Sequence, residues 1–185
     1  MRAVTPLALP ALRRLAACAG LAAALAATPA AARSMNCQSF MDGFNAAAGE
    51  HRVVFSRALS VGGRESGYEY YDGSGTGDVD VSVVCRDDRF VRVEVRSARA
   101  GAERVKARRE RLQQAALRVA AGQDGGRAAG TIRALAAEAQ DYLRASAERG
   151  DVFVAGKTER HLGGGVDVGY VATETDVALI VVVGS

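Results

Sequence analysis

Two histidines are the side chains in this sequence best suited to acid–base chemistry near neutral pH, because imidazole titrates in that range. His161 follows a polar stretch, Thr158–Arg160, in a segment flanked by glycines, and it is our candidate for the base of a small hydrolase. A solvent-exposed histidine in a loop is the more frequent origin of such a pattern. No G-x-S-x-G sequence supplies a nucleophile, so a non-enzymatic role is favoured over the hydrolase.

Neither a metal site nor a cofactor is predicted. The other histidine, His51, lies far from His161 along the chain, and no H-x-x-x-H or H-E-x-x-H spacing is present. Four aspartates border one predicted strand: Asp78, Asp80, Asp87 and Asp88. They lack the spacing of a known calcium loop, so we expect them on the solvent side of that strand. The glycines at 73–77 lack the Lys-Ser/Thr pair of a phosphate-binding loop and are expected to form a hairpin tip.

Charge is distributed unevenly along the chain. Residues 96–118 contain eight basic and two acidic side chains, whereas residues 65–88 contain seven acidic and one basic. Arg104, Arg108 and Arg111 lie three or four residues apart and therefore share one side of a predicted helix. The commoner explanation is that they solvate this helix and pair weakly with the acidic segment. The alternative is that they bind an anionic partner, either an envelope surface of phospholipid or lipopolysaccharide or an acidic protein.

The first 32 residues have the three parts of a secretory signal: a basic start, a short apolar run and small residues at the end. The basic residues are Arg2, Arg13 and Arg14. The apolar run, Leu15–Ala27, is shorter than the roughly 20 residues that cross a bilayer as a helix. We expect cleavage after Ala32, with Ala31 as the alternative, so that residues 33–185 form a single domain.

Two other kinds of leader share part of this pattern. Leu15–Cys18 matches a lipoprotein box, but the apolar stretch follows Cys18 instead of preceding it. The Arg13–Arg14 pair occurs in twin-arginine signals and equally in any basic leader. An ordinary secretory signal therefore explains the segment best. Because arginine greatly outnumbers lysine, which occurs only at Lys106 and Lys157, we expect a GC-rich bacterium and a periplasmic or extracellular protein.

Removing the leader also removes the net positive charge. The whole sequence has 24 basic and 21 acidic residues, and three of the basic ones lie in the leader. The remaining chain is formally neutral, which argues against a nucleic-acid-binding protein. None of its apolar stretches reaches the length of a transmembrane helix.

Two of the three cysteines, Cys37 and Cys85, remain after cleavage. Cys37 falls on the apolar side of a predicted helix, and Cys85 on the apolar side of a predicted strand. In an oxidising compartment such a pair indicates a disulfide, although two buried free thiols would give the same pattern. The absence of a C-x-x-C spacing argues against a redox-active pair.

Apolar spacing predicts an N-terminal helix followed by a β-meander. Residues 37–48 repeat apolar side chains at helical spacing, with Asn36 as the N-cap. Strands are then predicted at 53–61, 68–71, 79–85 and 91–95. The last two alternate apolar and polar residues on either side of a short polar turn, which is typical of a β-hairpin with one buried face.

The periodicity then becomes helical. Two helices are predicted over about 101–121 and 128–148, separated by a break at Gly122–Gly126, and we expect them to pack as a helical hairpin. A short strand is expected at 152–155, with loops around His161 and at Gly163–Gly165. Strands at 166–170 and 177–183 complete a C-terminal β-hairpin. The second of them is wholly apolar, so we expect it to be central in its sheet and buried on both faces.

Strands, then helices, then strands are the order of an α+β domain. We expect one mainly antiparallel sheet, built from the β-meander and the C-terminal hairpin, with the N-terminal helix and the helical hairpin on one face. We interpret the protein as a non-enzymatic binding or interaction module of the envelope, with Arg104, Arg108 and Arg111 as contact residues. The alternative is a small periplasmic hydrolase that uses His161 as its base.

Overall fold

The computed structural model describes residues 35–58, 67–75, 77–151 and 155–184. The helices in these ranges are α1 (Cys37–Ala48), the short 3-10 helix η2 (Gly49–His51), α2 (Glu103–Ala121) and α3 (Gly125–Glu148). The strands are β1 (Val54–Arg57), β2 (Tyr68–Ser74), β3 (Val79–Arg86), β4 (Arg89–Ala98), β5 (Gly156–His161), β6 (Val166–Ala172) and β7 (Asp176–Val183). The expected leader, the end of the strand expected at 53–61 and most of the strand expected at 152–155 lie outside the described residues.

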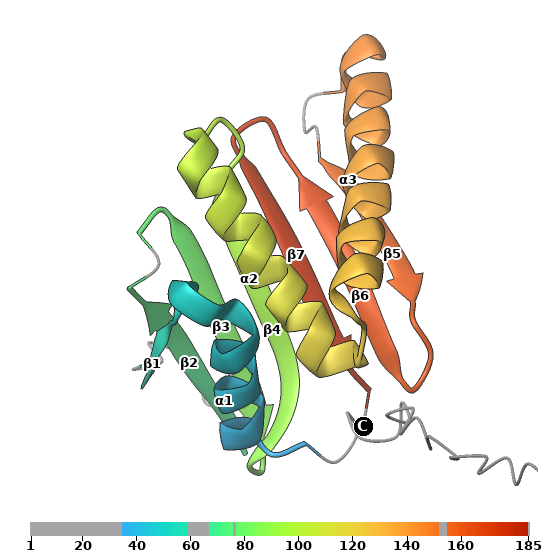
Figure 1. Cartoon of the computed structure of the whole chain (residues 1–185). Coiled ribbons are helices and arrows are strands. Elements are labelled where there is room, and N and C mark those ends of the chain that lie inside the picture. Colours follow the sequence, from blue (N-terminus) through green and yellow to red (C-terminus); the bar gives the residue numbers. More distant parts are fainter. Residues whose placement is uncertain (1–34, 59–66, 76, 152–154, 185) are drawn as a thin grey trace, which may run out of the picture.

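The strands form one antiparallel sheet in the order β1-β2-β3-β4-β7-β6-β5. The pairing of β4 with β7, in which Val95 lies opposite Leu179, joins the N-terminal meander to the C-terminal strands. Figure 1 shows the three α-helices on the same face of this sheet. There α1 lies against α2 and β4, α2 crosses β4 and β7, and α3 covers β5 and β6. The predicted α+β class, with a mainly antiparallel sheet and helices on one face, is confirmed.

The N-terminal helix forms where the sequence predicted it. The Asn36 side chain accepts a hydrogen bond from the Ser39 backbone N–H at 2.7 Å, which satisfies one of the free donors of the first turn and contributes about 1 kcal/mol. The apolar side of α1 packs on the sheet, where Phe40 stacks on Phe90 of β4 with ring centroids 3.7 Å apart. Cys37 and Cys85 form the predicted disulfide, with Cα atoms 5.9 Å apart, and both are buried as expected. Helix α1 is therefore tied to β3 at its first residue.

The connection between α2 and α3 is shorter than predicted. Gly122, with a left-handed φ of 61°, ends α2, and Asp124 already caps α3 by accepting the Arg127 backbone N–H at 2.9 Å. Gly125 and Gly126 thus lie in the first turn of α3 instead of in the break. The aspartate cap outweighs the poor helix propensity of glycine at these positions. None of the described helices has the length and apolar character needed to cross a membrane.

The segment that ends at His161 is a strand, whereas the sequence suggested a loop. β5 pairs with β6 alone among the described strands, and most of its side chains are polar and exposed. An edge strand of this kind has no apolar alternation, which is why the pattern missed it. The first residue of the strand, Gly156, has to be a glycine, because a Cβ at this position would lie 1.9 Å from the Ala139 carbonyl oxygen. The glycine therefore permits the close approach of α3.

The last strand, β7, is central as predicted, but the expectation that both of its faces are buried is wrong in part. Val177, Leu179 and Val181 are buried beneath the helices. Ile180 and Val182 face the other way and are only half-buried. All the described α-helices lie on the first face, so flanking strands alone shield the second.

Candidate functional site

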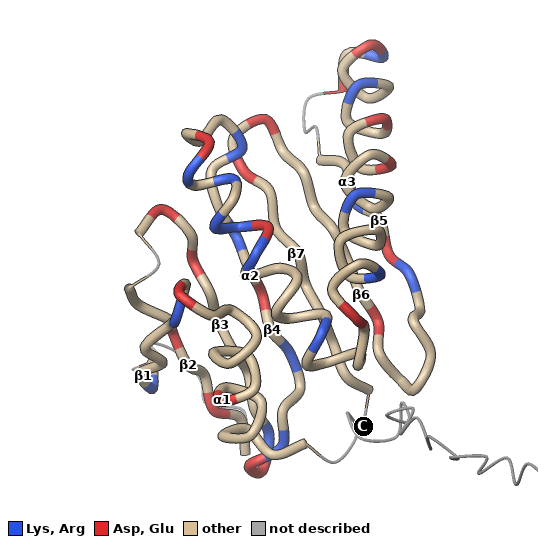
Figure 2. The backbone as a smooth tube through the Cα atoms, viewed as in Figure 1, with Lys and Arg blue, Asp and Glu red and all other residues tan. Residues whose placement is uncertain are grey.

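The three arginines singled out from the sequence lie in the N-terminal half of α2. Figure 2 shows that basic residues gather along this half of the helix. Arg104 and Arg111 are exposed and make no ion pair with another described residue, whereas Arg108 is half-buried and has an interaction partner. Of the three predicted arginines, two therefore have exposed guanidinium groups, and the third is half-buried and already interacts with another part of the protein.

A cleft of about 330 Å³ lies beside Arg104 and Arg108. His51, Gly77 and Asp78 also line it, so the acidic and basic segments of the chain meet here. Gly77 has a φ of 64°, and a Cβ at this position would lie 3.0 Å from a guanidinium nitrogen of Arg108. Glycine therefore both forms the turn and lets Arg108 lie against it. Because Asp78 offsets part of its positive charge, the cleft is less cationic than the outward side of α2.

His161 lies on the opposite edge of the sheet from β1 and so lies far from His51, which ends η2 shortly before β1. Its Nδ1 is 2.7 Å from Oδ1 of Asp167, and both side chains are more than half exposed. A carboxylate on Nδ1 is the contact that orients a catalytic histidine. Within the described part of the chain, however, no hydroxyl or thiol hydrogen-bonds the Nε2 atom. The nearby Thr158 hydroxyl instead donates to the Leu135 carbonyl oxygen at 3.3 Å.

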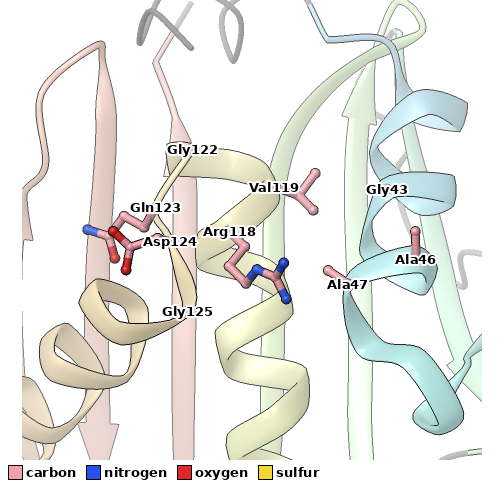
Figure 3. Close-up of a pocket in the computed structure, with 9 residues that line it drawn as sticks. All are labelled: Gly43, Ala46, Ala47, Arg118, Val119, Gly122, Gln123, Asp124 and Gly125. Atoms are coloured by element: carbon pink, nitrogen blue, oxygen red, sulfur yellow. The ribbon is translucent and has the colours of Figure 1, made fainter. Parts of the chain in front are cut away.

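A broader hollow of about 530 Å³ is lined by residues of α1, of the C-terminal end of α2 and of the α2–α3 connection. Small residues form its α1 side: Gly43, Ala46 and Ala47. Figure 3 shows Arg118 and Val119 extending towards that side, while Gln123 and Asp124 point away. The latter two are already hydrogen-bonded to α3. Arg118 is thus the main polar group offered to a ligand, which is too little for specific recognition.

A smaller hollow of about 210 Å³ lies between α2 and α3, over β6, and it has a polar floor. Gln113 and Tyr170 are buried there, with 1% and 4% of their surface exposed, and Arg109 lies beside them half-buried. Glu110 and Arg133 also line the hollow and are exposed. We call this hollow the α2–α3 groove. It brings the buried side chains of Gln113 and Tyr170 close to the half-buried Arg109.

Sequence reasoning missed the α2–α3 groove. The available signal was Gln113, a polar residue that follows Leu112 on the buried side of an otherwise apolar helical face. Tyr170 was predicted to lie in phase with Val166 and Val168, and its burial bears this out. The sequence alone does not show that Tyr170 of β6 and Gln113 of α2 lie next to each other where the helix packs on the sheet.

Burial raises the pKa of the Tyr170 hydroxyl above its ordinary value of 10.0, and this outweighs the opposing effects of Arg109 and Gln113. The hydroxyl is therefore neutral at physiological pH. It lies beside the Gln113 amide, but no hydrogen bond of ordinary geometry joins the two.

Among the described residues, no three histidine, cysteine, aspartate or glutamate side chains come close enough together to hold a metal ion. Comparisons of the chain with protein-family models, with curated proteins and with solved structures give no significant match. The function of this protein therefore has to be inferred from the geometry of its own sites.

Proposed function

We propose that this protein is a non-enzymatic binding protein of the bacterial cell envelope that contacts anionic phospholipid headgroups through α2. The observation that carries the proposal is the pair of exposed guanidinium groups, Arg104 and Arg111, which share one side of the helix without an ion-pair partner among the described residues. Arg108 lies between them in the sequence and adds a third positive charge to the same side. Together they form a compact cationic surface on an otherwise balanced chain.

A headgroup layer suits this surface better than a protein partner does. Protein interfaces usually have an aromatic or apolar centre. The large apolar side chains exposed in the described part of the chain are Val54, Tyr70 and Tyr142, and none of them lies on α2. A basic side chain near an anionic membrane contributes about 1 kcal/mol, so three of them give weak, reversible binding.

The proposed location outside the cytoplasm rests on the leader expected at residues 1–32. The disulfide between Cys37 and Cys85 supports it, because such bonds persist in oxidising compartments and are rare in the cytosol.

The hydrolase with His161 as its base is the second candidate function, and the Asp167 contact favours it. It is the weaker candidate because this histidine faces no nucleophile among the described residues. Loss of an esterase activity on His161→Ala would support it, and that activity would survive changes on α2.

Sedimentation with phosphatidylglycerol vesicles tests the lipid proposal. We expect the wild type to bind at low salt, to ignore phosphatidylcholine vesicles, and to be released as salt shortens the screening length from about 10 Å at 0.1 M to about 3 Å at 1 M. The double variant Arg104→Gln/Arg111→Gln should lose most of the binding and keep its fold, because exposed charges contribute little to stability.

The matched control is Arg127→Gln/Arg144→Gln on α3, which removes the same charge from arginines already paired with Asp124 and Asp141. This control should bind vesicles nearly as well as the wild type. If both double variants lost vesicle binding equally, the binding would depend on the net charge of the protein and not on Arg104 and Arg111. Equal binding of the wild type to phosphatidylglycerol and phosphatidylcholine vesicles would refute the proposal.

A further inference from the structure

The cleft beside the N-terminal half of α2 is lined by opposite charges that do not pair with each other. Arg104 of α2 and Asp78, which directly precedes β3, both line it, and both are exposed. Neither side chain makes an ion pair or a hydrogen bond with another described residue. Figure 2 shows the acidic start of β3 beside the basic half of α2. The cleft therefore offers one cation and one anion to a ligand that bears both charges.

Arg108 adds a second guanidinium group to this cleft. One of its terminal nitrogens lies 3.0 Å from the position that a Cβ of Gly77 would occupy, and both residues line the cleft. Arg104 lies one helical turn before Arg108 on α2. Like charges at this spacing repel each other. An anion that contacts both guanidinium groups removes this repulsion, and a phosphate group has enough acceptor oxygens to do so.

The rest of the lining limits the size and chemistry of a ligand. Val79 and Val105 are buried and supply apolar surface, while half-buried His51 forms a further part of the wall. The volume of about 330 Å³ is at the lower end of the roughly 300–1,000 Å³ typical of small-molecule sites. The cleft thus suits a small polar group with a short aliphatic link.

We propose that this cleft binds a phosphate ester with a primary ammonium group two carbons away, as in the headgroup of phosphatidylethanolamine. The phosphate accepts hydrogen bonds from the guanidinium groups of Arg104 and Arg108, and the ammonium group donates to the Asp78 carboxylate. This inference rests on the proposed function, because Arg104 also belongs to the cationic surface. It adds that one lipid headgroup is recognised individually, while Arg111 attracts the surrounding anionic lipid.

The Asp78 carboxylate determines which headgroup fits. A primary ammonium group has three N–H donors, whereas the quaternary ammonium group of choline has none. Asp78 therefore distinguishes two headgroups of the same net charge. A headgroup without a cation, such as that of phosphatidylglycerol, brings its negative charge into the cleft and leaves the carboxylate unpaired.

Vesicles of equal charge test the proposal. One set contains phosphatidylglycerol and phosphatidylcholine in equal amounts, and the other contains phosphatidylethanolamine in place of phosphatidylcholine. We expect the wild type to bind the second set about threefold more tightly, the size of effect expected from one partly exposed ion pair. Sedimentation of protein with the vesicles measures the difference.

Soluble compounds distinguish a lipid ligand from a free phosphate ester of the same chemistry. Titration of ¹⁵N-labelled protein, followed by NMR at the backbone amides of Gly77 and Val105, should show O-phosphoethanolamine binding more tightly than O-phosphocholine. If the protein distinguishes the soluble pair but not the two vesicle sets, the ligand is a free ester and the assignment to a lipid is wrong.

Asp78→Asn keeps the shape of the side chain and removes its charge. It should abolish both preferences and leave the fold intact, because this side chain contacts no described partner. The matched control is Asp80→Asn, which removes the same charge from an exposed residue that alternates with the buried valines of β3 and so faces away from the helices. The control should keep both preferences.

Arg111→Gln separates this inference from the proposed function. Arg111 does not line the cleft, so its loss should weaken binding to both vesicle sets and leave the binding of O-phosphoethanolamine unchanged.

Equal binding of the two vesicle sets, together with no preference for O-phosphoethanolamine, would overturn the inference even if the protein still required phosphatidylglycerol. An undiminished preference in Asp78→Asn would overturn it as well. Failure to bind any phosphatidylglycerol vesicle would instead refute the proposed function, and the soluble pair would still decide whether the cleft recognises this chemistry.

Discussion

Tyr170 combines an apolar ring with a hydroxyl that burial keeps neutral. Its pKa is raised mainly by burial, so the folded protein holds this proton more tightly than the unfolded chain does. The resulting contribution to stability is fully present below pH 10, the ordinary value, and is lost as the pH rises through the folded-state pKa.

We therefore expect the free energy of unfolding of the wild type to fall above pH 10, by up to about 1.4 kcal/mol per pH unit from this one proton. Tyr170→Phe should remove that part of the alkaline decline, which thermal unfolding between neutral and alkaline pH will measure. Tyr142→Phe is the control, because Tyr142 is 53% exposed. Parallel alkaline declines in the wild type and in Tyr170→Phe would show that the hydroxyl has no such role.

At the residue scale, the sequence was sufficient where a side chain follows the pattern of its element. Cys37 and Cys85 fall on apolar faces, and their pairing follows once both are buried. Gln113 breaks the pattern of its helix, and a sequence alone does not distinguish a functional break from an ordinary exposed residue. Arg108 was expected on an open surface with Arg104 and Arg111, but the turn at Gly77 partly covers it, a contact between distant segments.

Among the elements, α1 depends most on a covalent tie. The Cys37–Cys85 disulfide closes a loop with a sequence separation of 48, and the chain-entropy relation gives about 4 kcal/mol for a loop of this length. Replacing both cysteines by alanine should lower the free energy of unfolding by an amount of that order, as measured by urea denaturation. The wild type in reductant should shift by a similar amount. If the variant is destabilised and the reduced wild type is not, the loss comes from packing.

Helices and strands with one buried face were predictable from the spacing of their apolar residues. Elements whose bounds or exposure depend on contacts with other parts of the chain were not. β3 alternates buried Val79, Val81, Val83 and Cys85 with less buried residues that are polar except for Val84, so its two faces are visible in the sequence. β5 has no such alternation, because it is an edge strand and most of its side chains are polar and exposed. The start of α3 was misplaced for a related reason, since a single aspartate cap decides whether two glycines belong to a helix or to a turn.

For the whole molecule, the proposed secretion makes a prediction about the mature chain. Mass spectrometry of periplasmic material from a producing bacterium should find a protein that begins near Arg33, having lost residues 1–32. The expectation follows from the basic start, the apolar run and the small residues before this position. Recovery of the full-length chain from the cytoplasm, with none in the periplasm, would contradict both the cleavage and the proposed location.

The place of β7 in the sheet also determines when the molecule can assemble. β7 is the last described strand along the chain, yet it lies between β4 and β6 and joins the two halves of the sheet. A chain exported N-terminus first would hold β4 with one edge open until β7 has crossed the membrane. Pairings of such long sequence separation are slow to form, and an open strand edge invites association with other chains. If the protein is secreted as proposed, the sheet is completed only after β7 has crossed the membrane, and until then the open edge of β4 has to be kept from pairing with other copies of the chain.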